Sequence, residues 1–194
     1  MGGDARGRFV SRLVAHGRAA ATMLVVLATG ASASASANPL TREEALALAF
    51  PRATIAAERV FLTPAQRERA ASLAGEKIPS ALVARYVATG DGQVVGRAYV
   101  DTSVVRTKKE TLLVSLDAAG RVRRIDVTAF LEPIEYAPPE PWLKQYEARG
   151  LTDDLALNRA IRPIAGATLT ARAVTSAVRR ILAIDAVLQA GGTP

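Results

Sequence analysis

Residues 82–130 alternate apolar and polar side chains, and this period of two is typical of strands with one buried face. The turn residues Gly90-Asp91-Gly92 divide the first half of this stretch, and Ala118-Ala119-Gly120 divide the second half. Asp-Gly supplies the positive backbone angles of a tight hairpin turn. The four strand segments are LVARYVAT (82–89), QVVGRAYVD (93–101), TLLVSLD (111–117) and RVRRIDVTAF (121–130). They predict two hairpins, whose half-exposed sheet needs a covering layer.

Segments on the N-terminal side of the hairpins carry helix signals. Thr41 followed by Glu44 fits a capping box, and Pro51 ends the short helix that this box begins. Thr63 with Pro64 and Gln66 begins a second helix, which closes at Gly75. The intervening stretch ATIAAERVFL (53–62) is expected to be a strand. We therefore predict an N-terminal helical and strand extension over residues 38–80.

Two helices are expected after the hairpins. A proline-rich loop over residues 131–141 leads into one with Trp142, Leu143 and Tyr146, which are expected to be core residues. The other covers roughly residues 171–189. Its apolar stripe contains Val174, Ala177, Val178, Ile181, Leu182, Asp185 and Leu188, and Arg172, Arg179 and Arg180 lie outside that stripe. The fold class is therefore α+β, an antiparallel sheet of hairpins covered by helices, with a single domain over residues 81–190.

Residues 1–37 have the organisation of a secretory signal peptide. Arginines at positions 6, 8, 12 and 18 precede an apolar run over residues 19–31 and the small-residue tract ASASASA that ends at Ala37. The apolar run is shorter than the roughly 20 residues of a membrane-spanning helix. We expect cleavage near Ala37 and a periplasmic or otherwise exported protein; an uncleaved leader that anchors the protein in the membrane is the less favoured alternative.

Removal of this leader would also remove much of the chain's reactive chemistry. His16, Met1 and Met23 all lie within it, and the chain contains no cysteine. The remaining domain would have no thiol nucleophile, histidine base or usual zinc, copper or haem ligand, so we expect no metal, and redox work would need an organic cofactor.

The charge of the domain is modest. The leader holds four Arg and one Asp of a chain with formal charge +7, which leaves +4. Aromatic residues are only 5% of the chain and are not interleaved with basic runs, so nucleic-acid binding is not expected.

The stretch IAGATLTARAV (164–174) places small residues and two threonines at the start of the last helix. Gly166 lets the backbone approach a ligand, and the free N–H groups of a helix start attract anions. A threonine hydroxyl there can hydrogen-bond a phosphate or be esterified to one. The simpler alternative is that Thr168 only caps the helix.

Gly166-Ala167-Thr168-Leu169-Thr170, with the following Arg172-Ala173-Val174, resembles the flavinylation motif of the FMN-binding domain family. That family includes periplasmic flavoprotein subunits of sodium-pumping NADH:quinone reductases and Rnf complexes. The resemblance covers roughly residues 82–188, with the hairpin, the proline-rich loop and the terminal helix in the family's order. It implies FMN joined by a phosphoester to Thr168, attached by a separate flavin transferase, with Gly166, Ala167, Leu169 and Thr170 as further cofactor-binding residues.

The resemblance also suggests contacts from the loop after the second hairpin, and the chemistry of Arg106 makes it a further candidate. Glu132 stands where the family has a loop that touches the isoalloxazine, so it is a candidate to hydrogen-bond a ring N–H; the alternative is a solvated loop charge. Tyr136 is a candidate to line the ring. Arg106 is a candidate to pair with the phosphate, or else with a surface acid.

The function implied is that of an exported FMN protein that relays electrons. It would join a membrane dehydrogenase or quinol pool, through a membrane-bound electron-transfer partner, to a periplasmic or extracellular acceptor. An electron carrier is favoured over an enzyme with its own substrate. The alternative is a non-redox exported accessory or binding module, because Ala165 stands where the family usually has Ser or Thr and Arg162 lies where many members have Asp nearby.

Overall fold

The computed structural model of the chain describes residues 39–191, so the predicted signal peptide lies outside the described residues. Within this range, no helix combines the length and apolarity that crossing a membrane requires. The helices and strands follow one another along the chain as α1 (Arg42–Ala49), β1 (Thr54–Phe61), α2 (Pro64–Ala74), β2 (Leu82–Gly90), β3 (Gln93–Val104), β4 (Lys109–Asp117), β5 (Val122–Phe130), η1 (Ile134–Tyr136), α3 (Glu140–Leu143), η2 (Lys144–Tyr146) and α4 (Thr168–Gly191).

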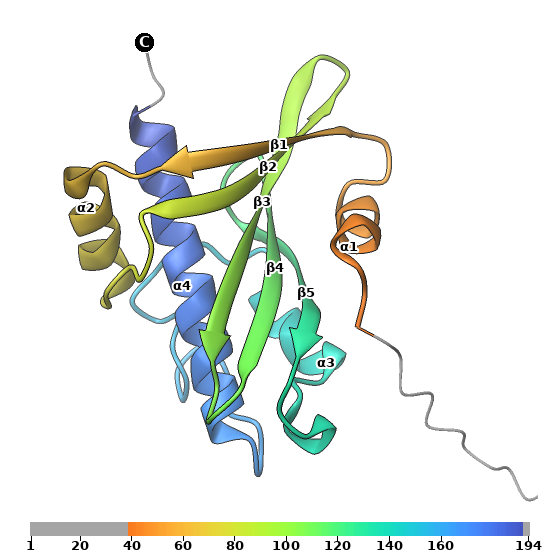
Figure 1. Cartoon of the computed structure of the whole chain (residues 1–194), viewed down its shortest axis with the longest axis vertical. Coiled ribbons are helices and arrows are strands. Elements are labelled where there is room, and N and C mark those ends of the chain that lie inside the picture. The colour runs from red at the N-terminus through yellow and green to blue at the C-terminus, as the bar shows by residue number, and fades with distance from the viewer. Residues whose placement is uncertain (1–38, 192–194) are drawn as a thin grey trace, which may run out of the picture. The chain divides into compact units, whose positions relative to one another are not determined.

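The strands form one antiparallel sheet of five, in the order β1-β2-β3-β4-β5 (Figure 1). Both predicted hairpins are present, and the α+β class is confirmed. Asp91 and Gly92 have φ of 50° and 76°, as a tight two-residue turn requires. Each strand pairs with its neighbour in sequence, so the sheet is a simple meander.

The segment before residue 81 belongs to this sheet. β1 pairs with β2 along its whole length, from Thr54 opposite Thr89 to Phe61 opposite Leu82. Both predicted capping boxes are formed, at Thr41 and at Thr63. The N-terminal extension expected over residues 38–80 thus supplies the edge strand and two helices of the same compact unit.

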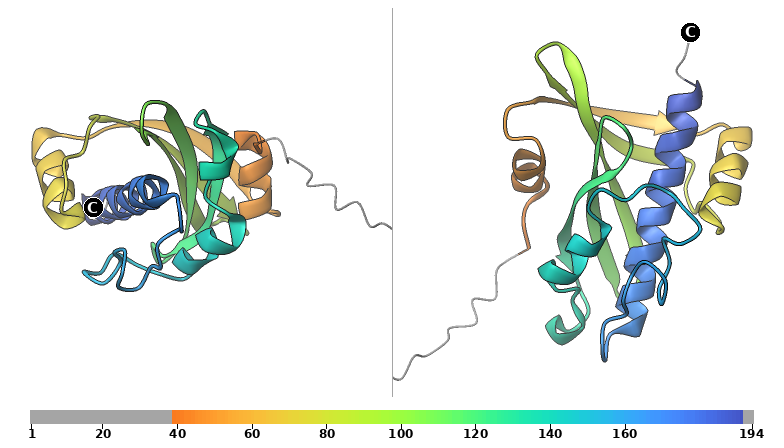
Figure 2. Two further views of the ribbon diagram at one scale, coloured as in Figure 1. Left: turned by 90° about the horizontal axis from the view of Figure 1, so that it is seen from below. Right: turned by 180° about the vertical axis from the view of Figure 1, so that it is seen from behind.

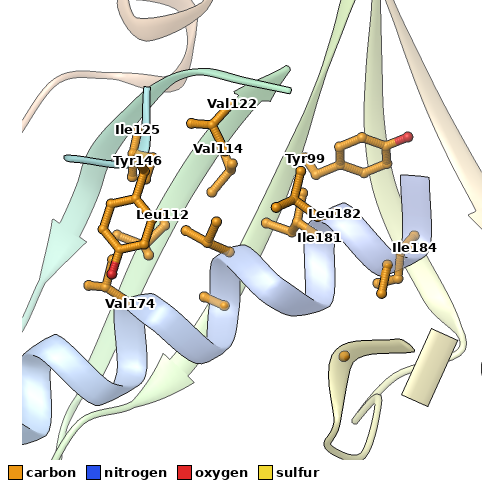
Figure 3. Close-up of a cluster of buried hydrophobic side chains, with 14 of the residues drawn as sticks. Tyr99, Leu112, Val114, Val122, Ile125, Tyr146, Val174, Ile181, Leu182 and Ile184 are labelled. Atoms are coloured by element: carbon orange, nitrogen blue, oxygen red, sulfur yellow. The ribbon is translucent and has the colours of Figure 1, made fainter. Parts of the chain in front are cut away.

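The long helix α4 covers one face of the sheet, and α1 covers part of the other (Figure 2). Branched side chains of α4 pack on residues of β3, β4 and β5 and on Tyr146 (Figure 3). On the opposite face, Leu46 and Phe50 pack with Ala88, Ala98 and Leu113. Of these two helices, α4 runs along the core face of β3, β4 and β5, and α1 packs over Ala88, Ala98 and Leu113 on the other face.

The structure differs from the sequence prediction in two places around α4. The helix begins at Thr168, ahead of the predicted residue 171. The prediction that Arg180 lies outside the buried stripe is wrong, because its guanidinium is buried and pairs with Asp101 at 2.8 Å and Glu76 at 3.3 Å. Trp142, Leu143 and Tyr146 are buried as expected, on α3 and η2.

Candidate functional site

A cavity of about 340 Å³ lies at the N-terminus of α4 and is also lined by residues of the β3–β4 turn and of η1. Three chain segments that are distant in sequence line it. Its lining residues are Arg106, Tyr136, Gly166, Ala167, Thr168, Leu169 and Thr170. The structure therefore brings together all of the residues predicted to bind the cofactor except Glu132.

The turn at Gly166 sets the direction of the helix. Gly166 has φ of 76°, a left-handed conformation that L side chains rarely adopt. A Cβ atom added there would meet no atom within 4 Å, so the backbone angle, and not lack of space, favours glycine. The first helical hydrogen bond runs from Ala171 N to Ala167 O at 3.0 Å. The N–H groups of residues 168–170 have no acceptor within the helix and are free to bind an anion.

Thr168 does not behave as a capping residue. The caps Thr41 and Thr63 each accept a hydrogen bond from a backbone N–H of their own first turn, both at 3.2 Å. Thr168 is exposed, and within residues 39–191 its hydroxyl has no hydrogen-bond partner. Thr170 is buried, and its hydroxyl donates to the carbonyl of Tyr136 at 2.7 Å. Of the two threonines, Thr168 is the one whose hydroxyl is accessible for esterification.

Arg106 and Tyr136 form the wall opposite the helix start. The Arg106 guanidinium lies over the Tyr136 ring, 5.4 Å from its centroid. A cation at this distance is attracted by the face of the ring, which limits the positions of the arginine side chain. The lining therefore includes a positive group, backbone N–H groups that have no acceptor within α4, and the apolar side chain of Leu169.

Glu132 is buried and is not part of the lining. Its Oε1 accepts hydrogen bonds from the backbone N–H groups of Arg106, Thr107 and Lys108 at 3.1, 2.7 and 2.8 Å. The bonds from Thr107 and Lys108 hold the pKa of the Glu132 carboxyl below its usual value. Glu132 was predicted either to hydrogen-bond the flavin ring or to be a solvated loop charge, and the structure shows neither arrangement. Instead, its carboxylate binds the backbone of the turn that carries Arg106.

Glu132→Gln is expected to loosen the β3–β4 turn, because a neutral amide oxygen accepts weaker hydrogen bonds than a carboxylate. Hydrogen exchange of a peptide that covers residues 105–109 should speed up, while Glu135→Gln, on an exposed neighbouring side chain, should leave it unchanged. Since the Glu132 pKa is lowered, protection in the wild type should fall as the pH drops through that pKa. Equal exchange in both variants would show that the carboxylate does not hold the turn.

Other cavities in the described part of the chain differ from this one. Those of about 430 and 310 Å³ are lined by Arg52 with Arg123 and by Arg180 with Thr102, but no helix begins in their lining. One of about 710 Å³ lies between the β2–β3 and β4–β5 turns, and its lining contains no Lys, Arg, Ser or Thr. Among residues 39–191, no three acidic side chains gather closely enough to hold a metal ion. The cavity at the start of α4 is therefore the candidate functional site.

Comparison of this chain with protein-family models, with curated proteins and with solved structures found no match. The resemblance to FMN-binding domains accordingly depends on the motif at residues 166–170 and the order of the surrounding segments.

Proposed function

We propose that this domain binds FMN in the cavity at the start of α4, with the flavin phosphate esterified to Thr168, and that it serves as an exported electron carrier. The observation that carries the proposal is the state of the two motif threonines. Thr168 presents at the cavity a hydroxyl that bonds to no other group of residues 39–191, whereas the hydroxyl of Thr170 is buried and hydrogen-bonded.

The lining suits the two ends of FMN. A volume of about 340 Å³ lies within the range of about 300–1,000 Å³ that small-molecule sites occupy. The free N–H groups of residues 168–170 and the Arg106 guanidinium suit a phosphate. The Tyr136 ring and the Leu169 side chain suit a flat, largely apolar ring system. FMN would supply the ability to take up two electrons together and to release them singly.

Esterification of Thr168 needs an activated flavin donor. With a flavin dinucleotide as donor, the Thr168 Oγ forms a bond to the flavin-side phosphorus, and the phosphoanhydride bond breaks. The other mononucleotide of the donor leaves with the oxygen that bridged the two phosphates, and the hydroxyl proton is lost to solvent or to the transferase. The step exchanges no electrons. The exposed position of Thr168 fits a reaction that a separate transferase must reach, since a buried hydroxyl would be inaccessible to it.

The test is the intact mass of protein produced in cells that contain a flavin transferase. The wild type should gain the mass of FMN less one water, and Thr168→Ala should lose this gain completely. Thr152→Ala is the matched control, because Thr152 is another exposed threonine, away from the cavity lining. An unmodified wild type would contradict covalent attachment, and flavin retained in Thr168→Ala would place the ester on another residue.

A non-redox binding module is the second candidate, and the residues before the motif favour it. Ala165 stands where a Ser or Thr precedes the glycine in the family. The backbone of Arg162 is fixed by two hydrogen bonds: its N–H donates to Gln145 Oε1 at 3.0 Å, and its carbonyl accepts from Trp142 Nε1 at 2.6 Å. A protein that carries no flavin, bound or covalent, after expression with the transferase would support this candidate.

A further inference from the structure

Three large apolar side chains beside the cavity are exposed to solvent. Val104 is 58% exposed, Leu131 58% and Ile134 71%. None of the three lines the cavity, so a ligand held there would leave them uncovered. They are called the apolar tip below.

Strand pairing places two residues of the apolar tip, Val104 and Leu131, at one end of the sheet, and Ile134 follows three residues after Leu131 at the start of η1. Val104 at the end of β3 is the register partner of Lys109 at the start of β4, and the Leu131 N–H donates to the Lys109 carbonyl at 3.0 Å. Adjacent Glu110 faces α4 and is buried, so Lys109 and Val104 point to the opposite face. The helix α1 covers that face farther along, over Ala98 and Leu113, and leaves this end open.

Positive charge predominates in the segments that carry the apolar tip and in the segment at the start of α4. Residues 104–109, 131–136 and 166–172 include four exposed cations and two acids, and one of these acids, Glu132, is bonded to backbone N–H groups. The cations are Arg106, Lys108, Lys109 and Arg172. Within residues 39–191, none of these four forms an ion pair.

We propose that the apolar tip inserts into the surface of an anionic lipid bilayer, with the neighbouring Lys and Arg side chains at the level of the lipid phosphates. Exposed branched side chains at a strand end and in the loop beside it can enter the headgroup region without unfolding of the backbone, and long cationic side chains nearby bind the phosphates. The cavity mouth would then lie close to the membrane surface. This surface does not require bound flavin, so the proposal stands or falls independently of FMN attachment.

The absence of cysteine from the chain permits a local test. Ile134→Cys is labelled with an environment-sensitive fluorophore and mixed with vesicles of phosphatidylglycerol or of phosphatidylcholine. Phe61→Cys is the matched control, since Phe61 is 72% exposed at the far end of β1. The full chain is used for both, so that any contribution from residues 1–38 is the same in the two samples.

The label at position 134 should shift to the blue with phosphatidylglycerol vesicles, and the label at position 61 should not. On the labelled Ile134→Cys protein, Leu131→Ser should weaken vesicle affinity about tenfold. Neutralisation of Lys108 and Lys109 to glutamine should weaken it roughly thirtyfold. No shift at position 134, or equal shifts at both positions, would overturn the proposal; the first result would leave a protein partner as the occupant of the apolar tip.

Discussion

Asp185→Ala is expected to lower the free energy of unfolding by about 3–5 kcal/mol, because it leaves a charge buried without its partner. The Asp185 carboxylate lies on the buried face of α4 and receives Arg97 Nε at 2.6 Å and Nη2 at 3.0 Å. It also accepts a hydrogen bond from the Tyr99 hydroxyl at 2.7 Å. Burial, and then the Asp185 charge, raise the pKa of Tyr99, so the phenol keeps the proton that it donates. Urea unfolding with an unchanged m-value would measure the loss.

Two further variants test whether the loss of stability comes from the hydrogen bonds among Arg97, Tyr99 and Asp185 or from any mutation of an acidic residue. Asp153→Ala changes an exposed acid and should alter stability by less than about 0.5 kcal/mol. A triple variant, Arg97→Met, Tyr99→Phe and Asp185→Leu, removes every polar member of the network and should recover most of the loss, since apolar replacements of buried ion pairs are often neutral. If Asp185→Ala were within 1 kcal/mol of the wild type, the network would not hold α4 to the sheet.

The strands and helix caps could be predicted from the sequence because their signals are local. Asp91-Gly92 determines a turn by its own backbone angles, and Thr41 and Thr63 satisfy N–H groups within their own helices. Alternation along β2 to β5 likewise depends only on which face of each strand is buried. These features need no knowledge of distant segments.

The charges under α4 could not be predicted in the same way. Periodicity placed Asp185 in the apolar stripe and Arg180 outside it, although both are buried. Their partners, Arg97 and Asp101, lie on β3, and only the tertiary structure shows that the helix and this strand meet. A buried ion pair depends on two positions far apart in sequence, so a helical pattern read alone gives no sign of it.

In the candidate site, too, the features with local sequence signals could be predicted, and those that depend on contacts between distant segments could not. The motif at residues 166–170 can be recognised because its glycine and threonines are contiguous, Tyr136 follows from the family resemblance, and the charge of Arg106 suits a phosphate. The part played by Glu132 depends on three backbone N–H groups of a turn more than twenty residues earlier. Side-chain identity alone cannot show whether a carboxylate faces a ligand or its own chain.

Glu110→Gln is expected to make the protein more stable at pH 9 and to leave it nearly unchanged at pH 5. Glu110 is fully buried on β4. Within the described residues, neither of its carboxylate oxygens has a hydrogen-bond partner, and neither does the hydroxyl of Ser103, which lies opposite Glu110 on β3. Burial, and then the Asp101 charge, raise the pKa of Glu110 to about 8. At pH 5 the carboxyl is therefore neutral in the folded protein and resembles the amide that replaces it.

The sign of the pH effect follows from proton binding. A folded pKa of about 8 against an ordinary value of 4.5 means that the folded state binds the proton more tightly than the unfolded state. The stability from this group is complete below about pH 4.5, falls as the pH rises, and is lost above about pH 8, a total of about 3–5 kcal/mol.

The difference in unfolding free energy between Glu110→Gln and the wild type, measured by urea titration at each pH, isolates this contribution from other buried acids. One such acid is Asp126, whose pKa burial also raises, and its effect is common to both proteins. The difference should grow between pH 5 and pH 9, whereas Glu147→Gln, on an exposed side chain, should give none. A constant difference across this range would mean that Glu110 is already charged at pH 5 and that a bound cation or water molecules satisfy its two oxygens inside the core.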